Sequence, residues 1–90
     1  MFFYVYVLQS KRSDKLYIEY TSNLIRRVKE HNLGLNQSTK LGRSWTLIYY
    51  EACRNRDDAK RREQYCKTSK GRMMVKLRVK EYLHNLLRFA

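Results

Sequence analysis

The chain has 90 residues, enough for one compact domain with a modest core, and we expect a single domain over residues 1–90. Lysine and arginine number 20 against 8 aspartate and glutamate residues, which gives a formal net charge of +12. An excess this large attracts polyanions, and nucleic acid is the commonest polyanion in a cell. Since no stretch approaches the roughly 20 apolar residues of a membrane span, we expect no membrane partner.

The two cysteines and the start of the chain bear on the compartment. Cys53 and Cys66 have neither the number nor the spacing of a disulfide framework or a zinc site. The first residues lack the basic flank and the small-residue cleavage site of a signal peptide. A reducing cytoplasm fits these features best, and we expect a cytoplasmic protein.

Two segments near the start have the pattern of paired strands. Residues 2–9 are rich in aromatic and β-branched side chains that alternate between two faces, and so are residues 16–21. The polar stretch 11–15 separates them, which predicts a β-hairpin. Residues 45–52 have the same composition and are the expected third strand.

A helix is expected between the second and third strands. Thr21 or Ser22 can cap it, and it should end near Asn32 and Gly34. The stretch from Gly34 to Ser44 is rich in Gly, Asn, Ser and Thr and is predicted to be a loop. The apolar positions of this helix are Leu24, Ile25 and Val28.

The second half of the chain predicts two further helices. Asn55 is a candidate N-cap for a helix running to about Lys67, and residues 67–72 are interpreted as a basic connector. A last helix should close the core, giving the order β-β-α-β-α-α. The predicted fold is a small α+β domain with helices packed on an antiparallel three-stranded sheet. The stripe of the last helix comprises Val75, Val79, Tyr82 and Leu86, with Met74, Leu77 and Leu83 beside it.

Two acidic residues stand out on these elements. Along the second strand, Tyr17, Glu19 and Thr21 share one face, because successive side chains alternate. Glu63 lies on the helical stripe most likely to face the sheet. A carboxylate directed toward a core needs a partner, so either an arginine or a metal ion should meet Glu63.

Three segments form an ordered set: residues 4–6 read Tyr-Val-Tyr, residues 17–19 read Tyr-Ile-Glu, and Glu63 lies on a basic helix. Together they resemble the core of a GIY-YIG nuclease domain. In that family two tyrosine-bearing strands pair as a hairpin, a following helix supplies an arginine, and a later glutamate holds a divalent metal. Residues 20–32 resemble the continuation found in small stand-alone bacterial members, and residues 59–63 resemble the metal-binding helix.

The resemblance implies roles for five residues. Arg27 matches the catalytic arginine, His31 matches a histidine frequent in this branch, and Glu63 would hold Mg²⁺ or Mn²⁺. Tyr17 or Tyr6 would position or deprotonate the attacking water. The implied reaction is hydrolysis of a phosphodiester bond, in which the metal polarises the scissile phosphate and Arg27 donates hydrogen bonds to it.

Each of these residues also has a structural interpretation. Tyr6 and Tyr17 are two of eight tyrosines and could be ordinary sheet aromatics, and Arg27 could be a solvated side chain. Glu63 could be only the i, i+4 partner of a lysine, and His31 could cap a helix C-terminus. The ordered set favours the site roles, although for His31 the two interpretations are about even.

Glu19 departs from the family pattern, which has glycine at this position. Three consequences are open: Glu19 pairs with Arg27 and blunts the site, adds a second metal ligand, or fills space that glycine leaves for the substrate backbone. An additional acid beside the expected base would raise the tyrosine pKa, which opposes catalysis. We therefore expect a nuclease fold whose activity is weakened or altered. Ser44 is a milder departure, from proline.

The partner implied by charge and resemblance is DNA, branched or damaged and handled in repair or recombination, with RNA the less favoured choice. A basic nucleic-acid-binding module without turnover is the alternative function. Metal dependence separates the two, because a binder does not need Glu63. The residues expected to contact nucleic acid are Arg26, Lys40, Arg43, Lys70 and Arg72.

Overall fold

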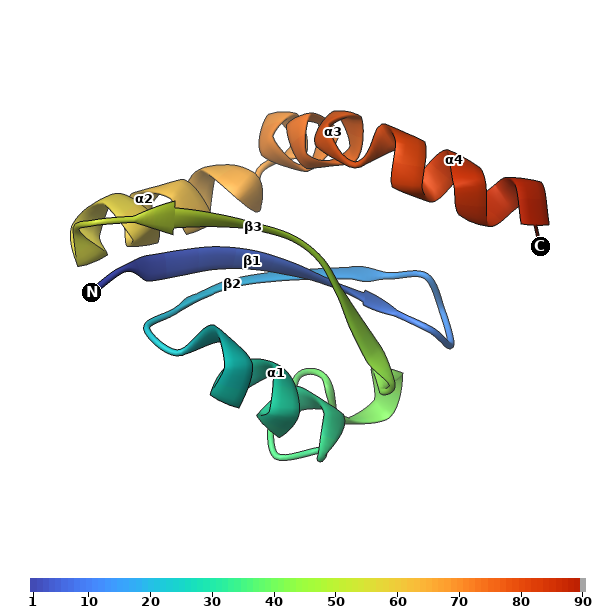
Figure 1. Ribbon diagram of the computed structural model, residues 1–90, viewed down its shortest axis with the longest axis horizontal. Coiled ribbons are helices and arrows are strands. Elements are labelled where there is room, and N and C mark those ends of the chain that lie inside the picture. Colours follow the sequence, from blue (N-terminus) through green and yellow to red (C-terminus); the bar gives the residue numbers. More distant parts are fainter. Residues whose placement is uncertain (90) are drawn as a thin grey trace.

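The computed structural model describes the backbone of residues 1–89 and the side-chain surroundings of residues 1–85. Over these residues the chain forms a three-stranded antiparallel sheet and four α-helices, which confirms the α+β fold (Figure 1). In chain order the elements are β1 (Phe3–Ser10), β2 (Leu16–Thr21), α1 (Leu24–Asn32), a 3-10 turn η1 (Lys40–Gly42), β3 (Trp45–Cys53), α2 (Arg56–Cys66), α3 (Ser69–Arg78) and α4 (Lys80–Phe89).

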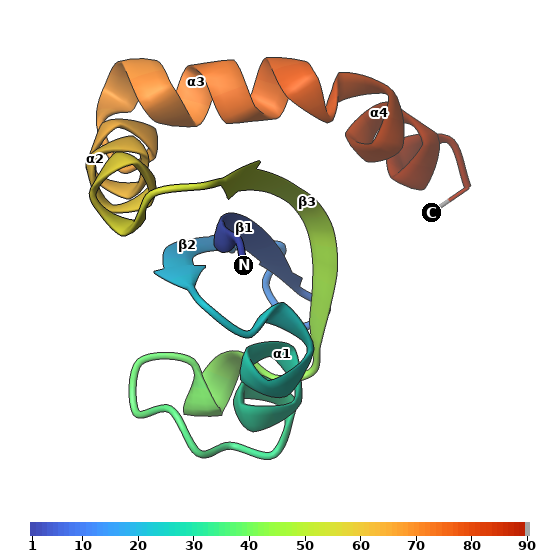
Figure 2. The same ribbon diagram turned by 60° about the vertical axis from the view of Figure 1, so that its left-hand side comes forward.

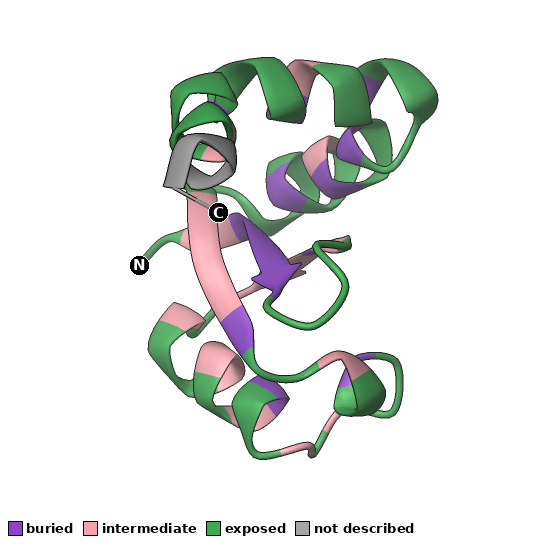
Figure 3. Cartoon of the chain, turned by 90° about the vertical axis from the view of Figure 1, so that its right-hand side faces the viewer, coloured by how far each residue is buried: buried purple, intermediate pink, exposed green. Residues whose placement is uncertain are grey.

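β1 is the centre strand of the sheet, whose order is β2-β1-β3. Both strand pairs are antiparallel, and β1 and β2 form the predicted hairpin. Residues 5–10 of β1 are all buried (Figure 3), because this strand is paired along both edges and covered on both faces. The register between β1 and β3 shifts at Val7 and Leu8, where Ile48 is the additional residue of a bulge.

Side chains of β1 alternate between two cores, one on each face of the sheet. Figures 1 and 2 show α1 on one face and α2 with α3 on the other. Tyr6 and Leu8 pack with Trp45 on the α1 face, joined by Tyr17, Leu24, Val28 and Leu47. The core on the other face consists of Val5, Val7, Ile18, Ala59, Cys66 and Val75.

α1 begins after Asn23, whose side chain accepts a hydrogen bond from the Arg26 backbone N–H at 3.1 Å. The prediction of Thr21 or Ser22 as the cap was therefore wrong by one or two residues, and Thr21 instead accepts from the Asn23 N–H. The helix ends at Asn32, as predicted. Gly34 follows with φ of +77°, a left-handed conformation that glycine adopts without a steric penalty, and its N–H bonds the His31 carbonyl.

The C-terminal part differs from the prediction in two ways. The stretch 67–72 is not a connector, because Thr68 caps α3 by accepting the Gly71 N–H at 3.0 Å. The predicted last helix is divided at Val79, which leaves helical dihedrals (φ −109°, ψ 22°), so α3 and α4 are separate helices. Val75 and Val79 are buried as expected, whereas Leu77 is 66% exposed. Of the predicted stripe, the side chain of Leu86 lies outside the described residues.

Among residues 1–89, none of the helices has the length and apolar character needed to cross a membrane.

Candidate active site

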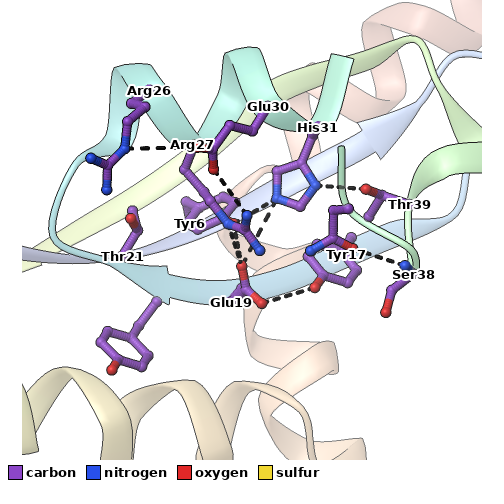
Figure 4. A network of polar contacts seen from close by, with 12 residues as sticks. Tyr6, Tyr17, Glu19, Thr21, Arg26, Arg27, Glu30, His31, Ser38 and Thr39 are labelled. Atoms are coloured by element: carbon purple, nitrogen blue, oxygen red, sulfur yellow. Dashed lines mark hydrogen bonds and ion pairs between the residues drawn. The ribbon is translucent and has the colours of Figure 1, made fainter. Parts of the chain in front are cut away.

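The face of the sheet that carries α1 brings four of the five predicted catalytic residues together (Figure 4). Tyr6 of β1 and Glu19 of β2 are direct partners in the strand register, so their side chains emerge side by side. Tyr17 lies two residues earlier on the same face of β2. Arg27 and His31 are four residues apart on α1, and both point from the helix toward the sheet.

Glu19 lies at the centre of this group and accepts three hydrogen bonds, two from tyrosine hydroxyls and one from a guanidinium group. Its Oε1 accepts from the Tyr6 hydroxyl at 2.7 Å and from Arg27 Nε at 3.0 Å. Its Oε2 accepts from the Tyr17 hydroxyl at 3.0 Å. Of the three consequences left open by the sequence, pairing with Arg27 is the one whose contacts are present.

His31 is fully buried between two hydroxyl groups. Its Nε2 lies 2.7 Å from the Tyr6 hydroxyl, and its Nδ1 lies 2.7 Å from Thr39 Oγ1. Because Tyr6 donates its only proton to Glu19, His31 Nε2 donates to Tyr6. Burial lowers the pKa of His31, and the nearby Arg27 lowers it further, which favours the neutral ring. In the neutral ring, Nδ1 accepts from the Thr39 hydroxyl. His31 is fully buried, so it is not a solvent-facing helix cap.

Thr39 was missed by the sequence analysis, although it is 1% exposed and fixes the His31 ring. Its loop is held by Trp45, whose indole N–H donates to the Thr39 carbonyl at 2.9 Å. Asn32 in turn accepts the Trp45 backbone N–H at 2.6 Å. The sequence gives no periodic signal for a contact between a loop residue and a helix, so nothing in the pattern could have identified it.

Arg27 has two acidic partners. Besides Glu19, it donates from Nη1 to Glu30 Oε1 at 3.0 Å, and Glu30 also lies 3.8 Å from Arg26. Burial by itself would lower the pKa of Arg27, but the bonds to Glu19 and Glu30 outweigh it and raise the pKa. Arg27 therefore stays charged at every pH at which the protein folds.

The two tyrosines are weak acids in this setting. Burial and then the contact with Glu19 raise the pKa of Tyr6 above its ordinary value of 10.0, and the same causes raise that of Tyr17 to about 12. Burial would also raise the pKa of Glu19, but the bonds donated by Tyr6, Arg27 and Tyr17 lower it below 4.5. With Glu19 present, neither phenol readily becomes a base at neutral pH.

These shifts predict how stability and tyrosine ionisation depend on pH. Above pH 10 the folded chain binds more protons than the unfolded one, so stability should fall as pH rises from 10 through 12, by up to about 1.4 kcal/mol per pH unit for each tyrosine. Glu19 acts at the acid end, where its contribution should be lost as pH falls below 4.5. Urea unfolding across both ranges measures these slopes.

Phenolate absorbance provides the matching control. Tyr49, on the opposite face, also has its pKa raised to about 12, by burial and by its bond to Glu51. In Glu19→Gly, the phenolate signals of Tyr6 and Tyr17 should move to lower pH while that of Tyr49 stays in place. An unchanged titration would contradict the assignment of these shifts to Glu19.

Glu63 lies apart from the tyrosines, on α2, and is 8% exposed. Its Oε2 accepts the backbone N–H of Tyr20 at 3.0 Å, a donor at the outer edge of the edge strand β2. Lys67 Nζ lies 3.7 Å away. The expectation of an arginine or metal partner was therefore incomplete, because a backbone amide and a lysine meet this carboxylate.

A cavity of about 400 Å³ connects the two acidic positions. Its walls include Glu19 and Arg27 on the α1 side of the sheet edge and Glu63 on the α2 side. Arg26 and Arg56 add positive charge to the rim. The cavity therefore has carboxylates to attract a cation and guanidinium groups to attract a phosphate.

The donor set of this cavity suits a hard cation that keeps most of its waters. Over the described residues no group of three or more His, Cys, Asp or Glu could hold a metal ion. Glu63 Oε2 accepts from the Tyr20 N–H, and Oε1 has only a long contact of 3.4 Å with Gln64 Nε2. A single carboxylate is a typical protein contribution to Mg²⁺ or Mn²⁺ in phosphate chemistry. The residues thus fit a magnesium-type ion and do not fit zinc.

The predicted nucleic-acid contacts fall on two sides of the molecule. Arg26 lines the cavity, and Lys40 and Arg43 lie in the loop segment that follows α1, where both are exposed. Lys70 and Arg72 lie on α3, across the sheet (Figure 1). Only the first three share the α1 side with Tyr6 and Arg27.

The chain is similar to several small proteins of known sequence and to one of known structure. A UPF0213 protein of Clostridium perfringens is 40% identical over 65 residues, covering 71% of this chain and 69% of that protein. A UPF0213 protein of Staphylococcus haemolyticus is 35% identical over 75 residues, covering 82% and 90%. The solution NMR structure of a UPF0213 protein from Bacillus halodurans matches with a TM-score of 0.57 at 30% identity, covering 91% of this chain and 90% of that one.

A family model described as the GIY-YIG catalytic domain matches residues 2–77, which include all five predicted catalytic positions. That family implies a nuclease-like role and a nucleic acid substrate, and its nucleases are generally metal-dependent. The sequence match over most of the chain and the likeness of the fold to a solved relative agree with each other. This chain belongs to the GIY-YIG catalytic domain family.

Proposed function

We propose that this chain is a metal-dependent DNA endonuclease of the GIY-YIG type whose phosphodiester hydrolysis is restrained by Glu19. One observation carries the proposal: the Glu19 carboxylate accepts hydrogen bonds from Tyr6, Tyr17 and Arg27 together. These are the donors that the family resemblance assigns to the reaction. A carboxylate and a phosphate are both anions whose oxygens accept hydrogen bonds from the same donors. In this proposal the Glu19 carboxylate therefore takes the place of the substrate phosphate.

Arg27 would bind a non-bridging phosphate oxygen and stabilise the charge that develops there during cleavage. Tyr17 or Tyr6 would orient the attacking water and take its proton, with His31 donating to Tyr6 so that a phenolate is stabilised. Glu63 would hold a Mg²⁺ or Mn²⁺ ion, which when bound polarises the phosphate and supports the leaving oxygen. Arg26 and Arg56 would contact flanking phosphates along the cavity rim.

Substrate must compete with Glu19 for these donors. The low pKa of Glu19 keeps it charged at neutral pH, so the competitor is always present. The bonds that it receives are charge-assisted, and such bonds are each worth about 1.5–3 kcal/mol. Weak cleavage is therefore expected of the chain as it stands.

Binding without turnover is the second candidate function. It is favoured by the same Glu19 contacts, since a site filled by an internal anion can hold DNA through surface charge while doing no chemistry. We take the substrate to be DNA in the cytoplasm, branched or damaged, in repair or recombination. The small cavity offers phosphate contacts and recognition by shape in place of base reading.

Glu63→Gln tests the metal role. Glutamine keeps an oxygen that can accept from Tyr20, so the fold should persist while the negative charge is lost. We expect cleavage of labelled branched duplex DNA with Mg²⁺ or Mn²⁺ to fall by about 100-fold or more, as it should when EDTA removes the metal. The assay should include Glu19→Gly and its Glu63→Gln double variant, in which the starting rate is higher.

Glu81→Gln is the matched control, because it removes a carboxylate whose side chain is 81% exposed and changes the net charge equally. It should leave cleavage intact. Cleavage that persists with Glu63→Gln would contradict the metal role. If no variant cleaves, Glu19→Gly included, while all bind DNA, the function is binding without turnover.

A further inference from the structure

A second cavity adjoins the first on the α1 face of the sheet and is lined mainly by apolar and aromatic groups. It has a volume of about 330 Å³. Tyr50 of β3 forms one wall and is 53% exposed, and Ile25 of α1 forms another and is 75% exposed. Ile25 is one of the three apolar positions expected on this helix, but unlike Leu24 and Val28 it does not pack in the core. The remaining walls are Tyr4, Ser22, Asn23 and Leu24.

The position of α1 explains why these aromatic groups stay uncovered. Tyr50 is the strand partner of Tyr6, but α1 covers Tyr6 and leaves the neighbouring end of the sheet open. The Tyr4 ring packs edge-on against Tyr50, with ring centroids 5.8 Å apart and planes at 68°. This contact fixes the Tyr50 ring while one side of it remains accessible.

Ser22 lines both cavities, so the aromatic surface and the proposed cleavage pocket adjoin at this residue. Positive charge lies beside it. Arg26 lines the first cavity with its side chain 67% exposed, and Arg56, the first residue of α2, lines the same cavity. A surface that joins a half-exposed tyrosine, a flanking set of arginines and a phosphate pocket matches the make-up of single-strand nucleic acid sites.

Resting on the function proposed above, we propose that Tyr50, supported by Tyr4, is a stacking site for one unpaired nucleobase next to the phosphate held by Arg27. A base inside an intact duplex is already stacked on its neighbours and cannot offer its face to the ring. The substrate class is therefore DNA with an unpaired nucleotide beside the cleaved bond, such as a flap or a frayed junction, over fully paired duplex.

Binding measurements test this site without relying on turnover. Fluorescein-labelled duplex carrying a short single-stranded flap, and the same duplex fully paired, are titrated with the native chain, Tyr50→Ala and Tyr50→Phe. Tyr50→Ala should weaken binding to the flap about 5- to 150-fold, the range expected for one stacked base, and leave duplex binding unchanged. Tyr50→Phe keeps the ring and should bind the flap like the native chain.

Tyr65→Ala is the matched control, since Tyr65 is 40% exposed but lines a different cavity, on α2. It should leave flap binding unchanged. Equal weakening of flap and duplex by Tyr50→Ala, or no weakening of either, would overturn the proposal. A change in sedimentation with Tyr50→Ala would also overturn it, because the surface would then join two copies of the chain.

The failure of this site is distinguishable from failure of the proposed function. Loss of cleavage in Glu63→Gln reports the metal-dependent reaction, whereas the difference between flap and duplex binding reports Tyr50 alone. If Glu63→Gln abolishes cleavage and Tyr50→Ala binds both DNAs normally, the nuclease proposal stands and the stacking site is wrong.

Discussion

Glu19→Gly should raise metal-dependent DNA cleavage by about 100-fold or more, because it restores two separate contributions to catalysis. Arg27 loses its main internal anion and becomes available to the phosphate, and a donor of this kind is worth about 10²–10³ in rate. Burial still raises the pKa of Tyr6 and Tyr17, but both lose the further increase caused by the Glu19 carboxylate and so deprotonate more readily, and a general base contributes about 10²–10⁴. Both gains depend on the same residue, so they arrive together.

The measurement is nicking of labelled branched and plain duplex DNA with Mg²⁺ or Mn²⁺. Glu19→Gln separates charge from volume, because glutamine fills the same space without the negative charge. If charge is the cause, glutamine should recover part of the gain, and if volume is the cause, only glycine should. A Glu19→Gly chain that folds, binds DNA and cleaves no faster than the native chain would show that Glu19 is not the restraint.

The same substitution should cost stability. Glycine removes the acceptor of three hydrogen bonds and adds backbone freedom to a strand. Because Glu19 and Arg27 line a cavity where water can replace part of the lost bonding, we expect a net loss of about 2–4 kcal/mol. Urea unfolding of the native chain and Glu19→Gly measures the difference. Higher cleavage combined with lower stability would mean that Glu19 stabilises the fold and reduces activity.

The fold was predictable from the sequence because its signals are local and strong. Alternation in residues 2–9 and 16–21 indicated the hairpin, and the Asn55 cap indicated α2. The division at Val79 was not predictable, since the apolar spacing continues through it and only the backbone dihedrals change. The start of α3 depends on Thr68 and on the close approach of Gly71 to the Tyr65 carbonyl, a tertiary contact without a periodic signature.

The site was predictable to the level of which residues meet, and no further. Strand alternation assigns Tyr6 and Tyr17 to a face of the hairpin, and the i, i+4 spacing puts Arg27 and His31 on one face of α1. Both patterns can be seen in the sequence. The hydrogen-bond partner of Glu19 could not be predicted, because it depends on distances between side chains of β1, β2 and α1. Thr39 and Tyr50 were not identified for a similar reason. Thr39 reaches His31 only because of how its loop folds, and Tyr50 is exposed only because α1 does not cover it.

Arg27→Met should mainly reduce stability in the native chain and mainly reduce cleavage in Glu19→Gly. In the native chain it leaves Glu19, 24% exposed, without its cation and removes the nearer of the two arginines that Glu30 contacts, so we expect a loss of about 1–3 kcal/mol in the free energy of unfolding. In Glu19→Gly the main partner is already gone, so the same change should cost much less stability. The difference between the two losses is the coupling free energy of Arg27 with Glu19.

The loss of cleavage activity should be larger in Glu19→Gly than in the native chain. In Glu19→Gly, Arg27→Met should remove most of the gained cleavage, about 10²–10³ in rate, because the phosphate loses its charged donor. Arg27→Lys keeps the charge but not the planar fork, so it should retain stability better than activity. Arg61→Met, at a position of α2 whose side chain is 78% exposed and which does not line the cavity beside Arg27, is the control for lost net charge. If Arg61→Met and Arg27→Met reduce cleavage equally, Arg27 acts only through the general positive field, and the catalytic role proposed for it is wrong.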